Sequence, residues 1–172
     1  TTLSQNKIVE FSEFIDDWDS GIQVEESHKN TDIAFSPSVI GGGQLIFSPL
    51  NSNDKGKLDL ALVSKYVGEQ YLDNTSSEFG KLDDYFVHDL RINYTLKTKL
   101  FKELVISSWV RNLLNQNYIS NAWIYRFQSL GYNPIDDDPS TNLENSETGR
   151  YNMIGAYNQA GINFFVGLKL RF

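Results

Sequence analysis

Cysteine is absent from the 172 residues, which excludes a disulfide framework, a thiol nucleophile and a cysteine-based metal site. Imidazole is scarce too, because only His28 and His88 supply it and they lie far apart in the sequence. No run of about 18 apolar residues occurs, so the sequence predicts no transmembrane helix. The opening TTLSQNKIVEF also lacks the basic and apolar regions of an export signal. If the protein crosses an inner membrane, we expect its export signal upstream, and we interpret the chain as a fragment or a mature C-terminal piece.

Basic residues are outnumbered, since 15 Lys and Arg stand against 22 Asp and Glu, a formal net charge of −7. Such a chain lacks the basic face that a nucleic acid backbone requires, so we expect no nucleic acid partner. Aromatic residues make up 13% of the chain, a bias typical of β-proteins and of the aromatic girdles of membrane β-barrels. The negative mean hydropathy of −0.37 also suits a barrel, because only alternate strand residues face lipid.

Alternation with a period of two predicts six strands. The clearest covers residues 162–172, where the even-numbered residues are all apolar and most odd-numbered ones are polar or small. Its length matches the roughly 9–11 residues of a bilayer-spanning strand. The other five strands are expected at 3–14, 33–47, 58–72, 85–97 and from 104 onwards. Within the second of these, Gly41–Gly43 is expected to form a bulge or bend.

The expected connections alternate between short and long. Short turns are expected at 48–56 and 98–101, and long loops at 15–32, 73–84 and 114–161. Bacterial outer-membrane barrels show this alternation, with short periplasmic turns and long extracellular loops, and it would place both termini on the periplasmic side. Asn112, at the end of its strand, is expected to form a turn.

A soluble β-sandwich is the main alternative, since six antiparallel strands with one apolar face can form half of one. The opposite face argues against it, because charged residues such as Asp89, Arg91 and Lys169 lie deep within the strands, as in the wall of a wet lumen. We therefore expect an all-β fold, in which residues 1–172 form about six strands of a larger antiparallel transmembrane β-barrel.

Four segments resemble the final strands of TonB-dependent outer-membrane receptors. They read SPSVIGG (36–42), SKYVGEQYLDNT (64–75), VRNLLNQNY (110–118) and GLKLRF (167–172), and they occur in this order. The second and third are the most specific, and the resemblance covers nearly the whole chain.

The resemblance implies a barrel of about 22 strands with an N-terminal plug, which is absent from this chain. Such receptors import a ferric siderophore, haem, cobalamin or a similar ligand across the outer membrane of a Gram-negative bacterium. The implied partners are the remainder of the barrel and its plug, outer-membrane lipid, the barrel-assembly machinery, and TonB through an N-terminal segment that is also absent. The C-terminus would be periplasmic, and no cofactor or enzymatic activity is implied.

Two other functions remain open. One is a non-transporting structural barrel subunit of an envelope complex, which would lack a plug and a TonB-binding segment upstream. The other is an outer-membrane hydrolase, which needs a Ser, His and acidic residue on adjacent strands. Only His88 lies on a regular predicted strand, so we rank the hydrolase last.

Two sets of residues are candidate ligand contacts. Aromatic side chains at the expected outer rim form either an interfacial girdle or a surface on which a ligand stacks. The acidic run Asp136–Asp138, with Glu144, either solvates its loop or binds calcium, although no glycine-bearing calcium loop is present. We expect no catalytic or metal site beyond this weak candidate. The rim aromatics are Trp18, Trp123, Tyr125, Phe127 and Tyr132.

Phe172 ends the alternating strand on an aromatic residue, which resembles the signal that barrel-assembly machinery reads through strand pairing. A role in the girdle alone is the alternative. We predict that deleting Phe172, or making Phe172→Ser, in the full-length receptor lowers the amount of assembled barrel while the folded barrel loses little stability. Heat-modifiable, membrane-inserted protein would be quantified, and unchanged amounts would leave only the girdle role.

Overall fold

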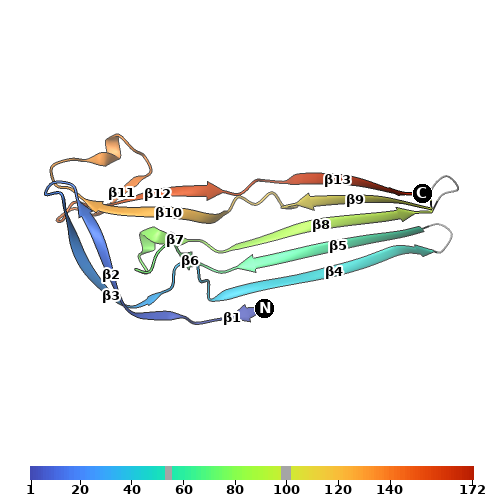
Figure 1. The fold of residues 1–172 in the computed structure, drawn as a ribbon, viewed down its shortest axis with the longest axis horizontal. Coiled ribbons are helices and arrows are strands. Elements are labelled where there is room, and N and C mark those ends of the chain that lie inside the picture. The colour runs from blue at the N-terminus through green and yellow to red at the C-terminus, as the bar shows by residue number, and fades with distance from the viewer. Residues whose placement is uncertain (53–55, 98–101) are drawn as a thin grey trace.

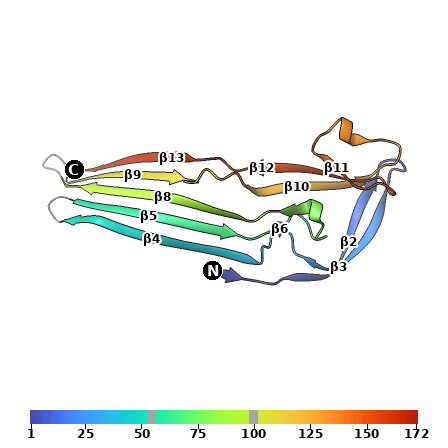
Figure 2. The same cartoon turned by 180° about the vertical axis from the view of Figure 1, so that it is seen from behind.

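The computed structural model describes residues 1–52, 56–97 and 102–172. These residues form β-strands and two three-residue 3-10 helices, η1 (Glu78–Gly80) and η2 (Pro134–Asp136). No helix in this described part is long and apolar enough to cross a membrane. Figure 1, and Figure 2 from behind, show two sheets that follow one another along a long molecule and do not stack face to face. The expected all-β fold is confirmed.

The first sheet has six strands, and every neighbouring pair in it is antiparallel. Its edges are β1 and β13, which do not pair with each other among the described residues, so the sheet is open. In spatial order, its strands are β1 (Thr2–Leu3), β4 (Val39–Ser52), β5 (Gly56–Val67), β8 (Tyr85–Leu96), β9 (Glu103–Arg111) and β13 (Asn163–Arg171).

The register of this sheet gathers most of its leucine and isoleucine side chains on one face. Leu168 lies opposite Ile106, for example, and Leu90 lies opposite Leu62. Because directly paired residues share a face, the predicted apolar rows of separate strands join into one surface. The opposite face carries Asp59, Asp89, Arg91, Asn93, Lys169 and Arg171. The apolar face includes Leu45, Phe47, Leu58, Leu60, Leu62, Phe86, Leu90, Ile92, Leu96, Leu104, Ile106, Val110, Phe164, Val166, Leu168 and Leu170.

The second sheet is built from two segments that lie between strands of the first sheet in the sequence, β2–β3 between β1 and β4, and β10–β12 between β9 and β13. Most of its pairs are antiparallel, but β10 and β2 pair in parallel through Phe127 with Asp16 and Gln128 with Asp17. A small ladder of β6 (Gln70–Tyr71) and β7 (Lys81–Leu82) lies beside it, and the buried core there joins Leu72, Leu82 and Ala122. Its strand order is β11 (Thr141–Asn145), β12 (Arg150–Asn158), β10 (Ile119–Gln128), β2 (Lys7–Asp17) and β3 (Ile22–Asp32).

Two of the expected long loops are therefore wrong. Segment 15–32 contains the end of β2 and all of β3, and segment 114–161 contains β10, β11 and β12. The strand expected at 3–14 is confirmed over residues 7–14, which lie in β2, but its place in the first sheet is wrong. Only Thr2–Leu3 joins the first sheet, and 7–17 belongs to the second. The backbone N–H and C=O groups of these polar segments hydrogen-bond to one another. The strands therefore form although their sequences show no alternating apolar pattern.

Of the bulge or bend expected at Gly41–Gly43, the bulge is wrong. All three glycines pair regularly with β5, and the register shifts between Phe47 and Leu50 instead. Pro49 lies within that shift and has no N–H to donate, which explains the irregularity. Residues 48–52 extend β4 and do not form a turn. The remaining turn residues, 53–55 and 98–101, lie outside the described part of the chain.

The termini lie at different levels of the first sheet (Figure 1). Thr2–Leu3 pair with Ile40 and Val39 at the beginning of β4, whereas β13 ends opposite Glu103 at the beginning of β9. The expectation that both termini share one end is therefore wrong for the first residues of this chain.

Asn112 forms the turn that its position predicts. Its φ of 51° is left-handed, a conformation that asparagine tolerates better than most residues. Its Nδ2 donates to the carbonyls of Gln116 at 2.8 Å and Ala160 at 3.1 Å, and its Oδ1 accepts from the Gln116 N–H at 2.9 Å. Asn112 thus ties the end of β9 to the start of β13.

We predict that Asn112→Ala lowers the free energy of unfolding by about 2–3 kcal/mol, because the left-handed backbone becomes strained and three hydrogen bonds are lost. Asn112→Gly keeps the backbone relaxed and should lose roughly half as much. Urea unfolding of the purified protein measures both, with the exposed Asn117→Ala as control. Equal stability of the alanine and glycine variants would contradict the backbone part of this explanation.

Candidate functional site

Four of the five rim aromatics come together where β2 and β10 meet. Trp18 follows β2, and its ring stacks on Phe127 at 4.0 Å between centroids and 12° between planes. Tyr132 lies 6.4 Å from Trp18 on the exposed side, and Tyr125 lies 5.5 Å from Phe127. Phe127 is fully buried and also stacks with Tyr151, so it supports the cluster. The surface that a ligand can reach is formed by Trp18 and Tyr132, each 45% exposed.

Trp123 lies apart from this stack, although it shares a face of β10 with Tyr125 and Phe127. Its indole covers Gly155 on β12, and a Cβ built at Gly155 would lie 2.2 Å from that ring. Trp123 remains 44% exposed. The glycine therefore makes room for a tryptophan that lies flat on the sheet, and any side chain at position 155 would displace it.

Acidic residues hold the stack in place. The Tyr125 hydroxyl donates to Asp16 at 2.6 Å and accepts from the Trp18 indole N–H at 3.2 Å. The Tyr125 hydrogen bond lowers the pKa of Asp16, and burial together with that bond raises the pKa of Tyr125. The Asp19 carboxylate accepts from the Ser129 hydroxyl at 2.7 Å and from the Leu130 N–H at 2.6 Å. Asp19 therefore fastens the tip of the β2–β3 hairpin to the end of β10.

The buried cation of the second sheet is Arg126, whose side chain is 5% exposed. Its Nη1 lies 2.9 Å from Glu13 of β2 and also bonds Asp73 after β6, and its Nε lies 4.0 Å from Glu144 of β11. Burial opposes the charge, but Asp73 and Glu13 outweigh it, so the pKa of Arg126 is raised. Its Nη2 finds no hydrogen-bond partner among the described residues.

A pocket of about 300 Å³ lies over this arginine. His28 bonds Glu13 at 2.9 Å on its wall, and Arg150 pairs with Glu26. Guanidinium donors and carboxylate acceptors thus line one space, an arrangement able to hydrogen-bond a polar ligand.

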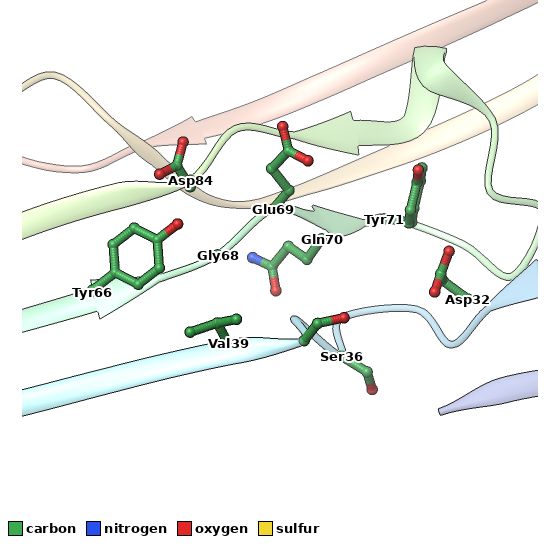
Figure 3. Close-up of a pocket in the computed structure, with 10 residues that line it drawn as sticks. Asp32, Ser36, Val39, Tyr66, Gly68, Glu69, Gln70, Tyr71 and Asp84 are labelled. Atoms are coloured by element: carbon green, nitrogen blue, oxygen red, sulfur yellow. The ribbon is translucent and has the colours of Figure 1, made fainter. Parts of the chain in front are cut away.

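A pocket of about 530 Å³ brings two of the resembling segments together (Figure 3). Gln70 lies at its centre between Tyr66 and Tyr71, all from the SKYVGEQYLDNT segment, and Ser36 and Val39 of the SPSVIGG segment line the other side. The Gly68 N–H donates to the Val39 carbonyl at 2.8 Å, so a backbone hydrogen bond joins the two segments. The same segments therefore form the joint between the two sheets.

The three carboxylates of the acidic run 136–138 have separate contacts, and Asp136 accepts from the Asn133 side-chain amide at 3.5 Å. Asp138 accepts from the Ser140 N–H at 2.8 Å and from its hydroxyl, which lowers the pKa of Asp138. Asp137 accepts from Tyr132 and raises the pKa of that phenol. In the described part of the chain, no group of three acidic, His or Cys side chains is arranged to hold a metal ion.

Phe172 follows β13 and is 77% exposed.

Sequence analysis did not identify Arg126 with its carboxylate partners, or the hydrogen bonds by which Asp16 and Asp19 hold the aromatic stack. Arg126 is the one charged residue in the segment AWIYRF, and an isolated charge in such an aromatic run indicates a buried ion pair. Its partners Glu13 and Asp73 lie 113 and 53 residues away, so no local pattern identifies them.

We predict that Asp19→Asn loosens the hairpin tip. The folded pKa of Asp19 lies below its ordinary value of 3.8, so its contribution is complete above that value and is lost as the pH falls through the folded pKa. Hydrogen exchange of residues 128–131 at neutral pH should accelerate about tenfold in the variant. Asp136→Asn is the matched control, and unchanged protection in Asp19→Asn would refute the attachment.

No protein-family model matches this chain, and no curated protein or solved structure matches it either. The resemblance to TonB-dependent receptors therefore stays a prediction from the four sequence segments.

Proposed function

We propose that this chain is the C-terminal barrel wall of a TonB-dependent outer-membrane receptor that imports a ferric siderophore, haem, cobalamin or a similar ligand. The observation that carries the proposal is the exposed apolar face of the first sheet. Leu45 is 75% exposed, Phe164 74% and Leu168 71%. Soluble proteins rarely leave so wide an apolar surface in water, whereas a barrel wall turns it to lipid.

The second sheet does not cover the apolar face of the first sheet. A β-sandwich would bury the apolar face under another sheet, but the second sheet continues beyond the end of the first (Figures 1 and 2). Lipid is the environment that matches such a face.

Strand length and the opposite face agree with the same environment. β5 and β8 have 12 residues each, and β9 and β13 have 9 each, close to the roughly 9–11 residues that cross a bilayer at a tilt. Arg91 and Lys169 lie on the other face, where a water-filled or plug-filled lumen would solvate them.

Open edges require further strands. Unpaired backbone groups are not tolerated in lipid, so the edges at β13 and along β4 need partners, which we assign to the remainder of the barrel. The second sheet would then stand outside the membrane and carry the exposed Trp18 and Tyr132 to the approaching ligand.

The absence of cysteine from this chain permits a direct test. Leu168→Cys and Lys169→Cys would be made separately in the full-length receptor, with any cysteine outside this chain replaced, in outer-membrane vesicles. We expect Leu168→Cys to react with a bilayer-soluble maleimide only, and Lys169→Cys to react with a water-soluble maleimide, because adjacent strand residues face opposite sides.

Equal reaction of both variants with the water-soluble reagent in folded protein would contradict a lipid-facing surface. Uptake of the nutrient in cells with and without TonB tests the transport role. Correct labelling without TonB-dependent uptake would support the non-transporting barrel subunit instead.

A further inference from the structure

The polar face of the first sheet carries a positive aromatic cluster in an otherwise acidic chain. Arg91, Trp109 and Phe165 lie directly opposite one another on β8, β9 and β13, so they form one row across three strands. The guanidinium carbons of Arg91 and Arg111 lie 4.5 Å and 5.2 Å from the centroid of the Trp109 ring. Both arginines therefore stack on one indole.

The nearest acid on this face is already engaged. Asp89 accepts from the Trp109 indole N–H at 3.1 Å and from the Asn112 N–H at 3.0 Å. These bonds fix the indole, and Asp89 forms no ion pair with either arginine among the described residues. Arg91 thus presents its donors without a carboxylate partner.

Small residues follow in the next row and leave a recess. Asn93, Ser107 and Gly167 lie opposite one another there, and a Cβ built at Gly167 meets nothing within 4 Å. The recess measures about 450 Å³ and is lined by Arg91, Trp109 and Phe165 above this floor. That volume suits a small organic ligand. Arg111 lies one row further on, outside the recess.

The charge around the recess favours an anion. Lys169 lies one row beyond Gly167 on the same face, at the end opposite Arg91. The acid in the floor row, Asp59 of β5, already pairs with Lys57 at 2.7 Å. The recess therefore lies between two cations and beside two aromatic rings.

We propose that this recess binds a small planar carboxylate, with Arg91 donating to the carboxylate and Trp109 and Phe165 contacting the ring. A guanidinium fork matches the two carboxylate oxygens, and the aromatic walls accept a flat apolar body. The site lies on the face opposite the apolar surface, so it does not depend on the proposed transport role.

The probe for the test is 2-naphthoate, titrated into the folded full-length protein in detergent and followed by its fluorescence polarisation. Its uncharged analogue 2-naphthylmethanol should bind at least about tenfold more weakly, because the charge-assisted hydrogen bonds are lost. Arg91→Gln should weaken naphthoate binding by about the same factor, and Gly167→Leu should abolish binding by filling the recess.

Arg111→Gln is the matched control, since it removes the same kind of group from the same indole but outside the recess, and binding should change less than about twofold. Heat-modifiability shows that each variant is folded. Absence of naphthoate binding to the wild type, equal binding of the alcohol, or equal losses in Arg91→Gln and Arg111→Gln would each overturn the proposal.

Discussion

One backbone register decides what each face of the first sheet touches. From β4 to β13 the hydrogen-bonded ladder places leucine opposite leucine or isoleucine on one side, as at Leu62 and Leu90 or Ile106 and Leu168. A slip of one residue in any strand would transfer its apolar row to the polar side. The same register aligns Arg91, Trp109 and Phe165, so the apolar surface and the recess on its reverse depend on one set of backbone bonds.

Arg126 plays the corresponding part in the second sheet. A buried guanidinium is costly to desolvate, and carboxylates from three separate segments offset that cost. Glu13 comes from β2, Asp73 from the turn after β6, and Glu144 from β11. Arg126 therefore links the β2–β3 hairpin, the connection between the two sheets and the edge strand β11.

The sequence predicts the first sheet well and the second poorly, for a physical reason. β8 and β13 are recognisable because one face is mostly apolar, as in Phe164, Val166 and Leu168. β3 reads IQVEESHKNTD, with polar residues on both faces, so its strand character comes from pairing with β2 and leaves no period in the sequence. Four of the rim aromatics do meet, but their supports, Asp16 and Asp19, read from the sequence as acidic loop residues. Asp16 and Asp19 are held by hydrogen bonds to residues more than 100 positions away in the sequence.

The parallel contact between β2 and β10 has a consequence for the order of folding. The β2–β3 hairpin closes over a short connection, 18–21, and its strands can pair as soon as both exist. Its docking partners Tyr125 and Arg126 are separated from it by 109 and 113 residues. Loop-closure entropy opposes so distant a contact until the intervening strands have aligned. The hairpin is therefore among the first units to form and among the last to dock, and the rim stack is complete only when the rest of the chain has folded beneath it.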